Sequence, residues 1–209
     1  MASPLGKLSV QVGKSGQGRY WKALPARLRQ RLKLGGCEFG KAAMMDDRWG
    51  IRSGEVGVDL PKSFDAGIYF IGRIGTPWKS RDDCPKNARE SDATCTVDVD
   101  ARYAAALLRV ETCSHLLLLY WMDQARRDLV VQAPRHYSEP RGTFALRSPV
   151  RPNPIAASVV RLLKVEGTRL SVVGLDCLDG TPLLDIKPYF ASTDAVPDAT
   201  VGWHTERQR

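Results

Sequence analysis

The sequence predicts a mainly β protein: an antiparallel β-barrel with small helical additions and an N-terminal extension. Three observations predict this class. Apolar segments of strand length follow one another from residue 67 onward. Links of hairpin length, such as Glu166-Gly167-Thr168, separate them. Stretches with helical spacing are few and short. Such a pattern is typical of antiparallel barrels.

The expected elements follow in chain order. A first strand is expected over 67–74, and the polar composition of 79–94 predicts a loop. Alanines and leucines at helical spacing predict a short helix over 102–110. Short apolar runs with polar flanks predict further strands over 116–121, 129–131, 155–165, 169–175 and 182–186. Residues 44–66 lack such a pattern and are expected to form a loop or lead-in.

The positive charge of the chain is concentrated near its start. The 209 residues carry 31 Lys and Arg and 23 Asp and Glu, a net charge of +8. Residues 1–43 hold nine basic residues and one acid, Glu38, so the remainder is neutral overall. Three interpretations of this segment stay open: a solvated tail, an organelle transit peptide or a nucleic-acid-binding arm. We therefore expect an extension over 1–66, disordered in large part, a barrel domain over 67–190 and a tail over 191–209.

Several classes of function are excluded by missing patterns. No apolar run approaches the roughly 20 residues that span a bilayer, and the first 30 residues lack a signal-peptide core. There is no Rossmann fingerprint, P-loop or nucleophile elbow. His136 and His204 are isolated, so no metal is expected. Ser114 and His115 are neighbours in a predicted strand and are expected to point to opposite faces, which would exclude a catalytic dyad. Five cysteines without a C-x-x-C pair predict free thiols and a cytoplasmic location.

One segment with unusual chemistry runs from Thr143 to Ile155 and reads T-F-A-L-R-S-P-V-R-P-N-P-I. Arg151 and Asn153 each precede a proline, which restricts their backbone to extended conformations. The loop is therefore expected to be stiff and to present the guanidinium groups of Arg147 and Arg151 to a carboxylate or phosphate. A rigid strand connection with solvated arginines is the alternative.

A second such segment runs from Leu175 to Tyr189 and reads L-D-C-L-D-G-T-P-L-L-D-I-K-P-Y. Asp179-Gly180 is a turn dipeptide, and Pro182 limits how the next strand starts. The turn is expected to expose backbone groups near two carboxylates, which can bind ribose hydroxyls or a cation. The alternative is a plain hairpin turn.

The two segments resemble the TsaA-like (TrmO-type) S-adenosylmethionine-dependent tRNA methyltransferases. Two shorter elements are similar too: I-G-R-I-G-T-P-W over 71–78 and C-S-H-L over 113–116. The resemblance covers about Gly67 to Tyr189. It implies a β-barrel methyltransferase that acts as a homodimer, with S-adenosyl-L-methionine as cofactor. The implied methyl acceptor is N6 of threonylcarbamoyladenosine at position 37, next to the anticodon of tRNA.

The resemblance also implies site residues, position by position. The cofactor-binding positions of the family fall on Pro85, Lys86, Asn87, Asp123, Gln124, Arg147, Ala157, Cys177, Leu178, Asp179 and Gly180. Substrate contacts are expected from Arg151, Asn153 and Lys187. Removal of the N6 proton would help the transfer, and Asp123 and Asp185 are the candidate bases. The cofactor carboxylate would be bound by Arg147 or Arg151.

The chain departs from the family pattern at several positions. Lys86-Asn87 replaces Arg-Gln, Asp123 replaces His, and Ala156 replaces the usual Gly. Bacterial members known for tRNA methylation carry a further C-terminal domain, whereas about 20 residues follow Tyr189 here. Cofactor binding is therefore better supported than the tRNA substrate. A non-catalytic S-adenosylmethionine-binding or regulatory module is the alternative function.

Overall fold

The computed structural model describes residues 10–12, 50–135 and 137–205. The chain divides into two compact units. The first comprises Met1–Gly67 and Met122–Ala156, and the second comprises Ile68–Trp121 and Ala157–Arg209. The segment 122–156, which the sequence pattern assigned to the barrel domain, is thus grouped with the N-terminal residues.

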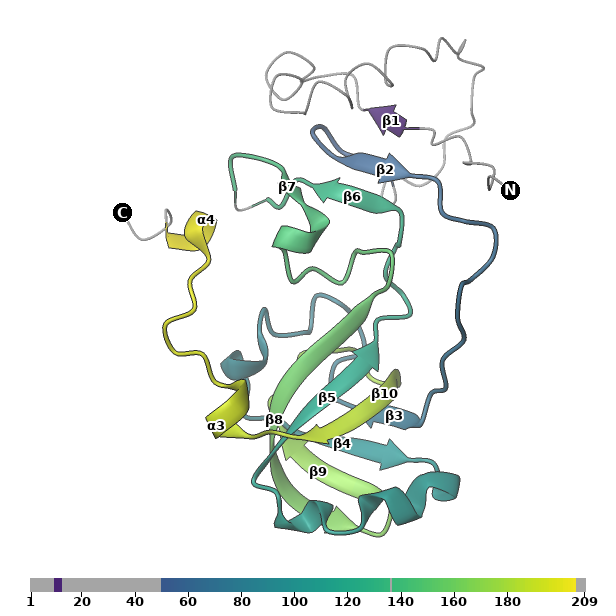
Figure 1. Ribbon diagram of the computed structural model, residues 1–209, viewed down its shortest axis with the longest axis vertical. Coiled ribbons are helices and arrows are strands. Elements are labelled where there is room, and N and C mark those ends of the chain that lie inside the picture. Colours follow the sequence, from purple (N-terminus) through teal and green to yellow (C-terminus); the bar gives the residue numbers. More distant parts are fainter. Residues whose placement is uncertain (1–9, 13–49, 136, 206–209) are drawn as a thin grey trace, which may run out of the picture. The chain divides into compact units, whose positions relative to one another are not determined.

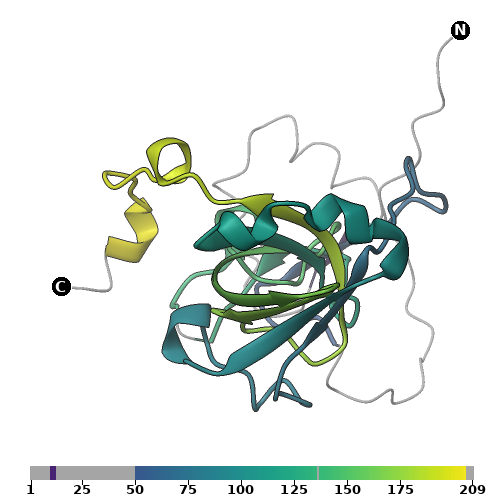
Figure 2. The ribbon, with the colours of Figure 1, turned by 90° about the horizontal axis from the view of Figure 1, so that it is seen from below.

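The second unit is built on a closed barrel of six antiparallel strands, which confirms the predicted fold class (Figures 1 and 2). Around the barrel the strand order is β10-β3-β4-β9-β8-β5. The strands are β3 (Gly72–Gly75), β4 (Thr94–Val99), β5 (His115–Trp121), β8 (Ile155–Glu166), β9 (Arg169–Val173) and β10 (Thr181–Pro188). The predicted strands at 116–121, 155–165, 169–175 and 182–186 are therefore confirmed within a few residues.

Alternate side chains of these strands fill the barrel. Leu116, Leu118 and Tyr120 of β5 are buried, whereas the residues between them are only half-buried. Strand β4 shows the same alternation, because every second side chain of a strand points to the same face. The sequence pattern did not predict β4, which begins where the expected loop ends.

Short helices accompany the barrel. They are η2 (Ala88–Glu90), η3 (Ala101–Leu107), η4 (Val110–Thr112), α3 (Ala191–Asp194) and α4 (Gly202–Thr205). The helix predicted over 102–110 is instead the two 3₁₀ segments η3 and η4. Arg109 lies between them with a φ of 73°, a left-handed conformation that no helix continues through. Figure 2 shows both segments, in teal, lying across one side of the barrel.

The first unit contains a four-stranded antiparallel sheet with the order β1-β2-β6-β7. Its elements are β1 (Val10–Val12), β2 (Val56–Val58), β6 (Leu129–Gln132), β7 (Arg141–Gly142) and the 3₁₀ helix η5 (Thr143–Ala145). The prediction of a loop over 44–66 is wrong at β2. The remaining expectations for the basic segment concern residues 1–9 and 13–49, which lie outside the described residues.

Some expectations concern absent features. Within the described ranges, no helix is long and apolar enough to cross a membrane. The same residues contain no group of three or more His, Cys, Asp or Glu that could bind a metal ion. Four cysteines fall in the described ranges and form no disulfide there: Cys84, Cys95, Cys113 and Cys177. Cys37 and His136 lie outside these ranges.

Candidate functional site

Strand direction places most of the predicted cofactor residues of the second unit at one end of the barrel. The end of β3 pairs with the start of β10 (Ile74 with Thr181), and the end of β9 pairs with the start of β4 (Val173 with Thr94). The loops 76–93 and 174–180 therefore leave the barrel at the same end. Predicted cofactor positions lie on these loops and near the start of β8: Pro85, Lys86, Asn87, Ala157, Cys177, Leu178, Asp179 and Gly180.

Asp179 ties these loops together. Its Oδ1 accepts a hydrogen bond from the backbone N–H of Thr76 (3.0 Å), and its Oδ2 lies 2.5 Å from Nζ of Lys79. The Thr76 hydroxyl in turn donates to the carbonyl of Cys177 (3.0 Å). The Lys79 ammonium and the Thr76 N–H hold the pKa of the Asp179 carboxyl below its usual value. Asp179 is therefore ionised at neutral pH and acts as a clamp between the G-T-P-W turn and the D-G-T-P turn.

Asp176 lies near the start of the second loop, directly before Cys177. Burial and, after it, the charge of Asp176 raise the pKa of the Cys84 thiol, next to Pro85. Burial is also the main reason why the pKa of Cys177 is raised to about 12. Both cysteines are thus protonated at neutral pH, which suits apolar contacts and not nucleophilic chemistry.

Asn87 shapes its own loop. Its Oδ1 accepts from the backbone N–H of Arg89 (2.9 Å), and its Nδ2 donates to Oε1 of Glu90 (2.6 Å). Asn87 is the N-cap of η2, a position that asparagine favours. The backbone N–H of Lys86 also donates to Glu90 (3.1 Å). The departure from glutamine at residue 87 therefore fits a local structural role.

Two predicted residues do not join this group. Lys187 and Asp185 lie on β10 beyond the site end, where Lys187 pairs in register with Leu117 near the start of β5. The two side chains form an ion pair of 2.7 Å. Asp185 also accepts from the backbone N–H of Ile186 (2.9 Å). Of the two candidate bases, Asp185 is thus separated from the loops that hold the other predicted residues of the second unit.

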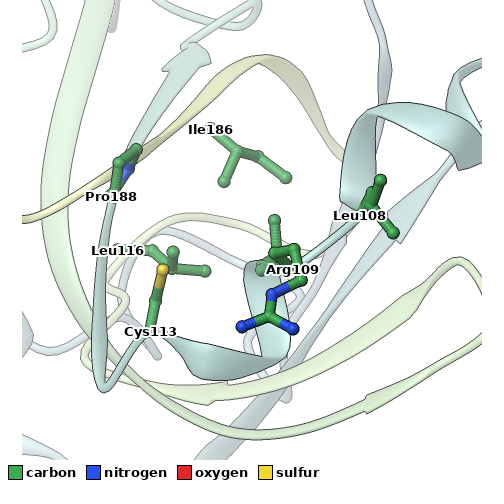
Figure 3. A pocket seen from close by; sticks show the side chains of 7 residues that line it. Leu108, Arg109, Cys113, Leu116, Ile186 and Pro188 are labelled. Carbon is green, nitrogen blue, oxygen red and sulfur yellow. The ribbon is translucent and has the colours of Figure 1, made fainter.

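The opposite end of the barrel carries a pocket of about 230 Å³ (Figure 3). Its walls come from the 3₁₀ segments, the start of β5 and the end of β10: Leu108, Arg109, Val110, Cys113, Leu116, Ile186 and Pro188. Apolar side chains dominate this wall, and Arg109 supplies its charge. None of the predicted cofactor residues lines it, and it offers no carboxylate for a ribose or an ammonium group.

In the first unit, buried hydrogen bonds hold the loop 143–154. Nε2 of Gln132 donates to the carbonyl of Val150 (2.6 Å) and to the hydroxyl of Thr143 (2.8 Å). That hydroxyl donates to the carbonyl of Leu129 (2.9 Å). Gln132 and Thr143 are both buried. The prolines of the loop are thus supplemented by contacts with β6.

The two arginines of this loop differ. The guanidinium of Arg151 turns back onto its own loop and donates to the carbonyls of Ser148 (2.9 Å), Thr143 (3.4 Å) and Leu146. These contacts give Arg151 a structural role. Arg147 has an exposed side chain. Arg147 is therefore the better of the two candidates for an anionic ligand group.

The remaining predicted residues of the first unit are Asn153, Asp123 and Gln124. Oδ1 of Asn153 accepts from Arg127 (3.4 Å), whose Nε donates to the carbonyl of Pro152 (2.6 Å). The backbone N–H of Met122 donates to the carbonyl of Pro154 (2.9 Å), beside Asp123 and Gln124. Both of these side chains are exposed.

The expectation that the side chains of Ser114 and His115 point to opposite faces is wrong. Nδ1 of His115 lies 3.1 Å from Oγ of Ser114. The alternation rule does not apply, because Ser114 precedes β5 and has no strand conformation. Both residues are exposed.

Tyr120 and Ser158 lie near these loops, and the sequence did not indicate either of them. The hydroxyl of Tyr120, on β5, lies 2.9 Å from Oγ of Ser158, on β8, and donates to Oδ1 of Asp176 (3.1 Å). The resemblance gave no signal for either. The adjacent positions, Ala157 and Cys177, are in the predicted set.

Comparisons with known proteins identify the family of the chain. The family described as tRNA-methyltransferase O N-terminal domain matches residues 73–195. The probable S-adenosyl-L-methionine-binding protein VirR of Rhizobium radiobacter is 49% identical over 157 residues, which are 75% of this chain and 89% of VirR. A tRNA (adenine(37)-N6)-methyltransferase of Eikenella corrodens is 52% identical over 65 residues, or 30% of this chain and 37% of that enzyme.

A solved structure is similar to this chain as well. The crystal structure of TrmO from Pseudomonas aeruginosa matches with a TM-score of 0.56 at 35% identity, over 66% of this chain. The match spans 62% of the crystallised chain. The family match over residues 73–195 and the similar solved structure lead to one conclusion: the chain belongs to the tRNA-methyltransferase O family, through the N-terminal domain of that family.

Proposed function

We propose that the protein is an S-adenosyl-L-methionine-dependent methyltransferase that methylates N6 of threonylcarbamoyladenosine at position 37 of tRNA. The observation that carries the proposal is that the predicted cofactor positions of the second unit lie at one end of the barrel, beside loops that Asp179 holds together. The names of VirR and of the Eikenella enzyme support the cofactor and the acceptor, respectively.

The residues present fit the chemical groups of this cofactor. Asp179, whose carboxylate is exposed in part, can meet an ammonium group or ribose hydroxyl, and the half-buried Leu178 offers apolar surface to an adenine ring. Arg147 is proposed to pair with the cofactor carboxylate, because two parallel N–H donors match that group. When bound, the cofactor would supply an electrophilic methyl group on its sulfonium.

The contribution of the chain is chiefly positional. Methyl transfer is an in-line displacement, and correct placement of acceptor and methyl supplies much of its rate enhancement. The acceptor N6 is amide-like and loses its proton on transfer. Since Asp185 lies away from the site end, Asp123 is the proposed group that accepts this proton.

Charge supports an RNA substrate. The first unit has 18 basic and 9 acidic residues, a net charge of +9, whereas the second has 13 and 14, a net charge of −1. Residues 1–49 account for +7 of this charge, and the described residues of the unit carry 8 basic and 6 acidic side chains, a net charge of +2. Phosphate contacts by such a unit give affinity without sequence preference.

Exposed aromatic rings accompany this charge. Phe144 of η5 is 85% exposed, and Phe64 is 80% exposed with the guanidinium of Arg127 5.4 Å from its ring. Exposed flat rings stack with unpaired bases, and the bases of an anticodon loop are unpaired.

Phe144→Ala is expected to weaken tRNA binding roughly tenfold, since base stacking is worth about 1–3 kcal/mol. Fluorescence anisotropy with labelled tRNA at fixed salt measures this. The control is Phe190→Ala, which removes an exposed phenylalanine (59%) from the second unit and should leave affinity unchanged. Equal affinities for the two variants would remove Phe144 from the RNA surface.

Arg147→Ala is expected to weaken binding of S-adenosyl-L-methionine by about tenfold or more, because a charge-assisted hydrogen bond contributes about 1.5–3 kcal/mol. Isothermal titration calorimetry measures this. Arg102→Ala, an exposed arginine on η3, is the control and should bind like wild type. Wild-type protein that fails to bind at millimolar cofactor would refute the proposed function itself.

Methyl transfer is tested with tRNA from a strain that lacks this methylation. The full chain, the cofactor and this tRNA are incubated, and the nucleosides are analysed by mass spectrometry. The proposal requires that threonylcarbamoyladenosine gain the mass of one methyl group. Cofactor binding without transfer would favour the alternative, a non-catalytic binding module. The expected homodimer and cytoplasmic location belong to the same proposal.

A further inference from the structure

The hydroxyl of Tyr120 joins three separate parts of the second unit. Tyr120 is the sixth residue of β5 and is only 2% exposed. Its proton is donated to the carboxylate of Asp176 (3.1 Å), in the loop between β9 and β10. The Ser158 hydroxyl (2.9 Å), on β8, then donates to the phenolic oxygen, because that oxygen has no second proton to give.

The two partners of Tyr120 each lie next to predicted cofactor positions. Ser158 follows Ala157 directly, and Asp176 precedes Cys177 directly. Asp176 also acts electrostatically on Cys84, beside Pro85. One hydroxyl group thus connects the strand segment at Ala157 with the loop 176–180.

From this geometry we propose that Tyr120 is a positioning residue of the cofactor site. Its hydroxyl holds Asp176 and Ser158 at a fixed separation, and so sets the distance between the segments that carry Ala157 and Cys177. The inference rests on the proposed binding of S-adenosyl-L-methionine at this end of the barrel. It assigns to Tyr120 no contact with the cofactor and no part in proton transfer.

The protonation of Tyr120 agrees with this role. Burial and the nearby Asp176 charge raise the pKa of its phenol far above the working range. The side chain therefore stays a neutral hydrogen-bond donor at every physiological pH and does not serve as a base. Its ring packs inside the barrel, so only the hydroxyl points to the loop that it holds.

Tyr120→Phe tests the inference, because it keeps the buried ring and removes only the hydroxyl. Calorimetry with S-adenosyl-L-methionine is expected to show roughly tenfold weaker binding, the loss that goes with a hydrogen bond to a carboxylate. In the methylation assay, KM for the cofactor should rise by a similar factor while kcat at saturating cofactor stays within about twofold. Tyr103→Phe, which removes a hydroxyl elsewhere in the same unit, is the control and should leave both values unchanged.

Variants at Asp176 separate positioning from simple loss of stability. Asp176→Asn keeps an oxygen that accepts from Tyr120 and should bind the cofactor nearly as wild type does. Asp176→Ala removes the acceptor and should match Tyr120→Phe. Adding Tyr120→Phe to Asp176→Ala should cause little further loss, since both remove the same contact.

The outcomes distinguish the inference from the proposed function. If wild type binds the cofactor and Tyr120→Phe binds it equally well, Tyr120 is a core residue only and the inference is wrong. If Asp176→Asn binds as weakly as Asp176→Ala, Asp176 acts through its charge and not through Tyr120. If wild type does not bind the cofactor, the proposed function fails first.

Discussion

Gly72→Ala is expected to destabilise the barrel by about 3 kcal/mol or more, which lowers its melting temperature by roughly 10 to 20 °C. The first residue of β3 pairs with Val99 of β4. A Cβ at residue 72 would lie 2.1 Å from the carbonyl oxygen of Asp98 and 2.9 Å from Cα of Val99. Both atoms belong to the backbone, so no side-chain rotation relieves the overlap. Circular dichroism during heating measures the effect.

The effect should be specific to this position. Gly202→Ala is a matched control in the same unit, because an added Cβ there meets no atom within 4 Å. It should melt within a few degrees of wild type. A Gly72→Ala protein that melts with the control would show that β3 and β4 do not pair in this register.

The strands that were predicted are those that are rich in apolar residues and have polar flanks. Leu116 to Trp121 and the hairpin around Gly167 have this pattern, and both were found. Strand β4 was missed because its outward side chains are polar. Asp98 among them accepts a hydrogen bond from Arg169 across the β4–β9 pair (2.5 Å). The alternation of Cys95, Val97 and Val99 was the signal that would have identified it.

Apolar composition also led to a wrong prediction of where the first barrel strand begins. Ile68, Tyr69 and Phe70 were included in the first predicted strand, but they are exposed and lie outside any strand. The pairing of β3 with β10 begins only at Gly72, opposite Leu183. Whether an apolar run has a partner strand depends on the closure of the barrel, and local sequence carries no record of that closure.

The sequence likewise indicated some features of the predicted site and not others. Adjacent motif residues such as Asp179 and Gly180 follow from the resemblance, because they lie on one turn. The Tyr120–Ser158 contact joins positions 38 residues apart and arises only when β5 and β8 lie side by side in the barrel. The prolines around Arg151 indicated a stiff loop, but they do not determine where its guanidinium points. In the structure it contacts the loop's own carbonyls.

Gln132→Met is expected to destabilise the first unit by about 2–3 kcal/mol, because a buried acceptor left without its donor costs about 1–3 kcal/mol. Methionine fills nearly the same volume but donates nothing to Val150 or Thr143. Chemical denaturation followed by tryptophan fluorescence measures the change. Gln124→Met is the control for stability, since Gln124 is exposed in the same unit and its replacement should cost little.

The structure also predicts which part of the protein loses stability in Gln132→Met. Gln132 connects β6 to the loop 143–154, so its replacement should increase hydrogen exchange over 143–151 and leave the amides of β5 and β10 protected. Increased exchange in the barrel strands as well would mean that the two units unfold as one. Unchanged exchange over 143–151 would mean that the prolines alone hold the loop, and that Arg147 owes its position to them and not to Gln132.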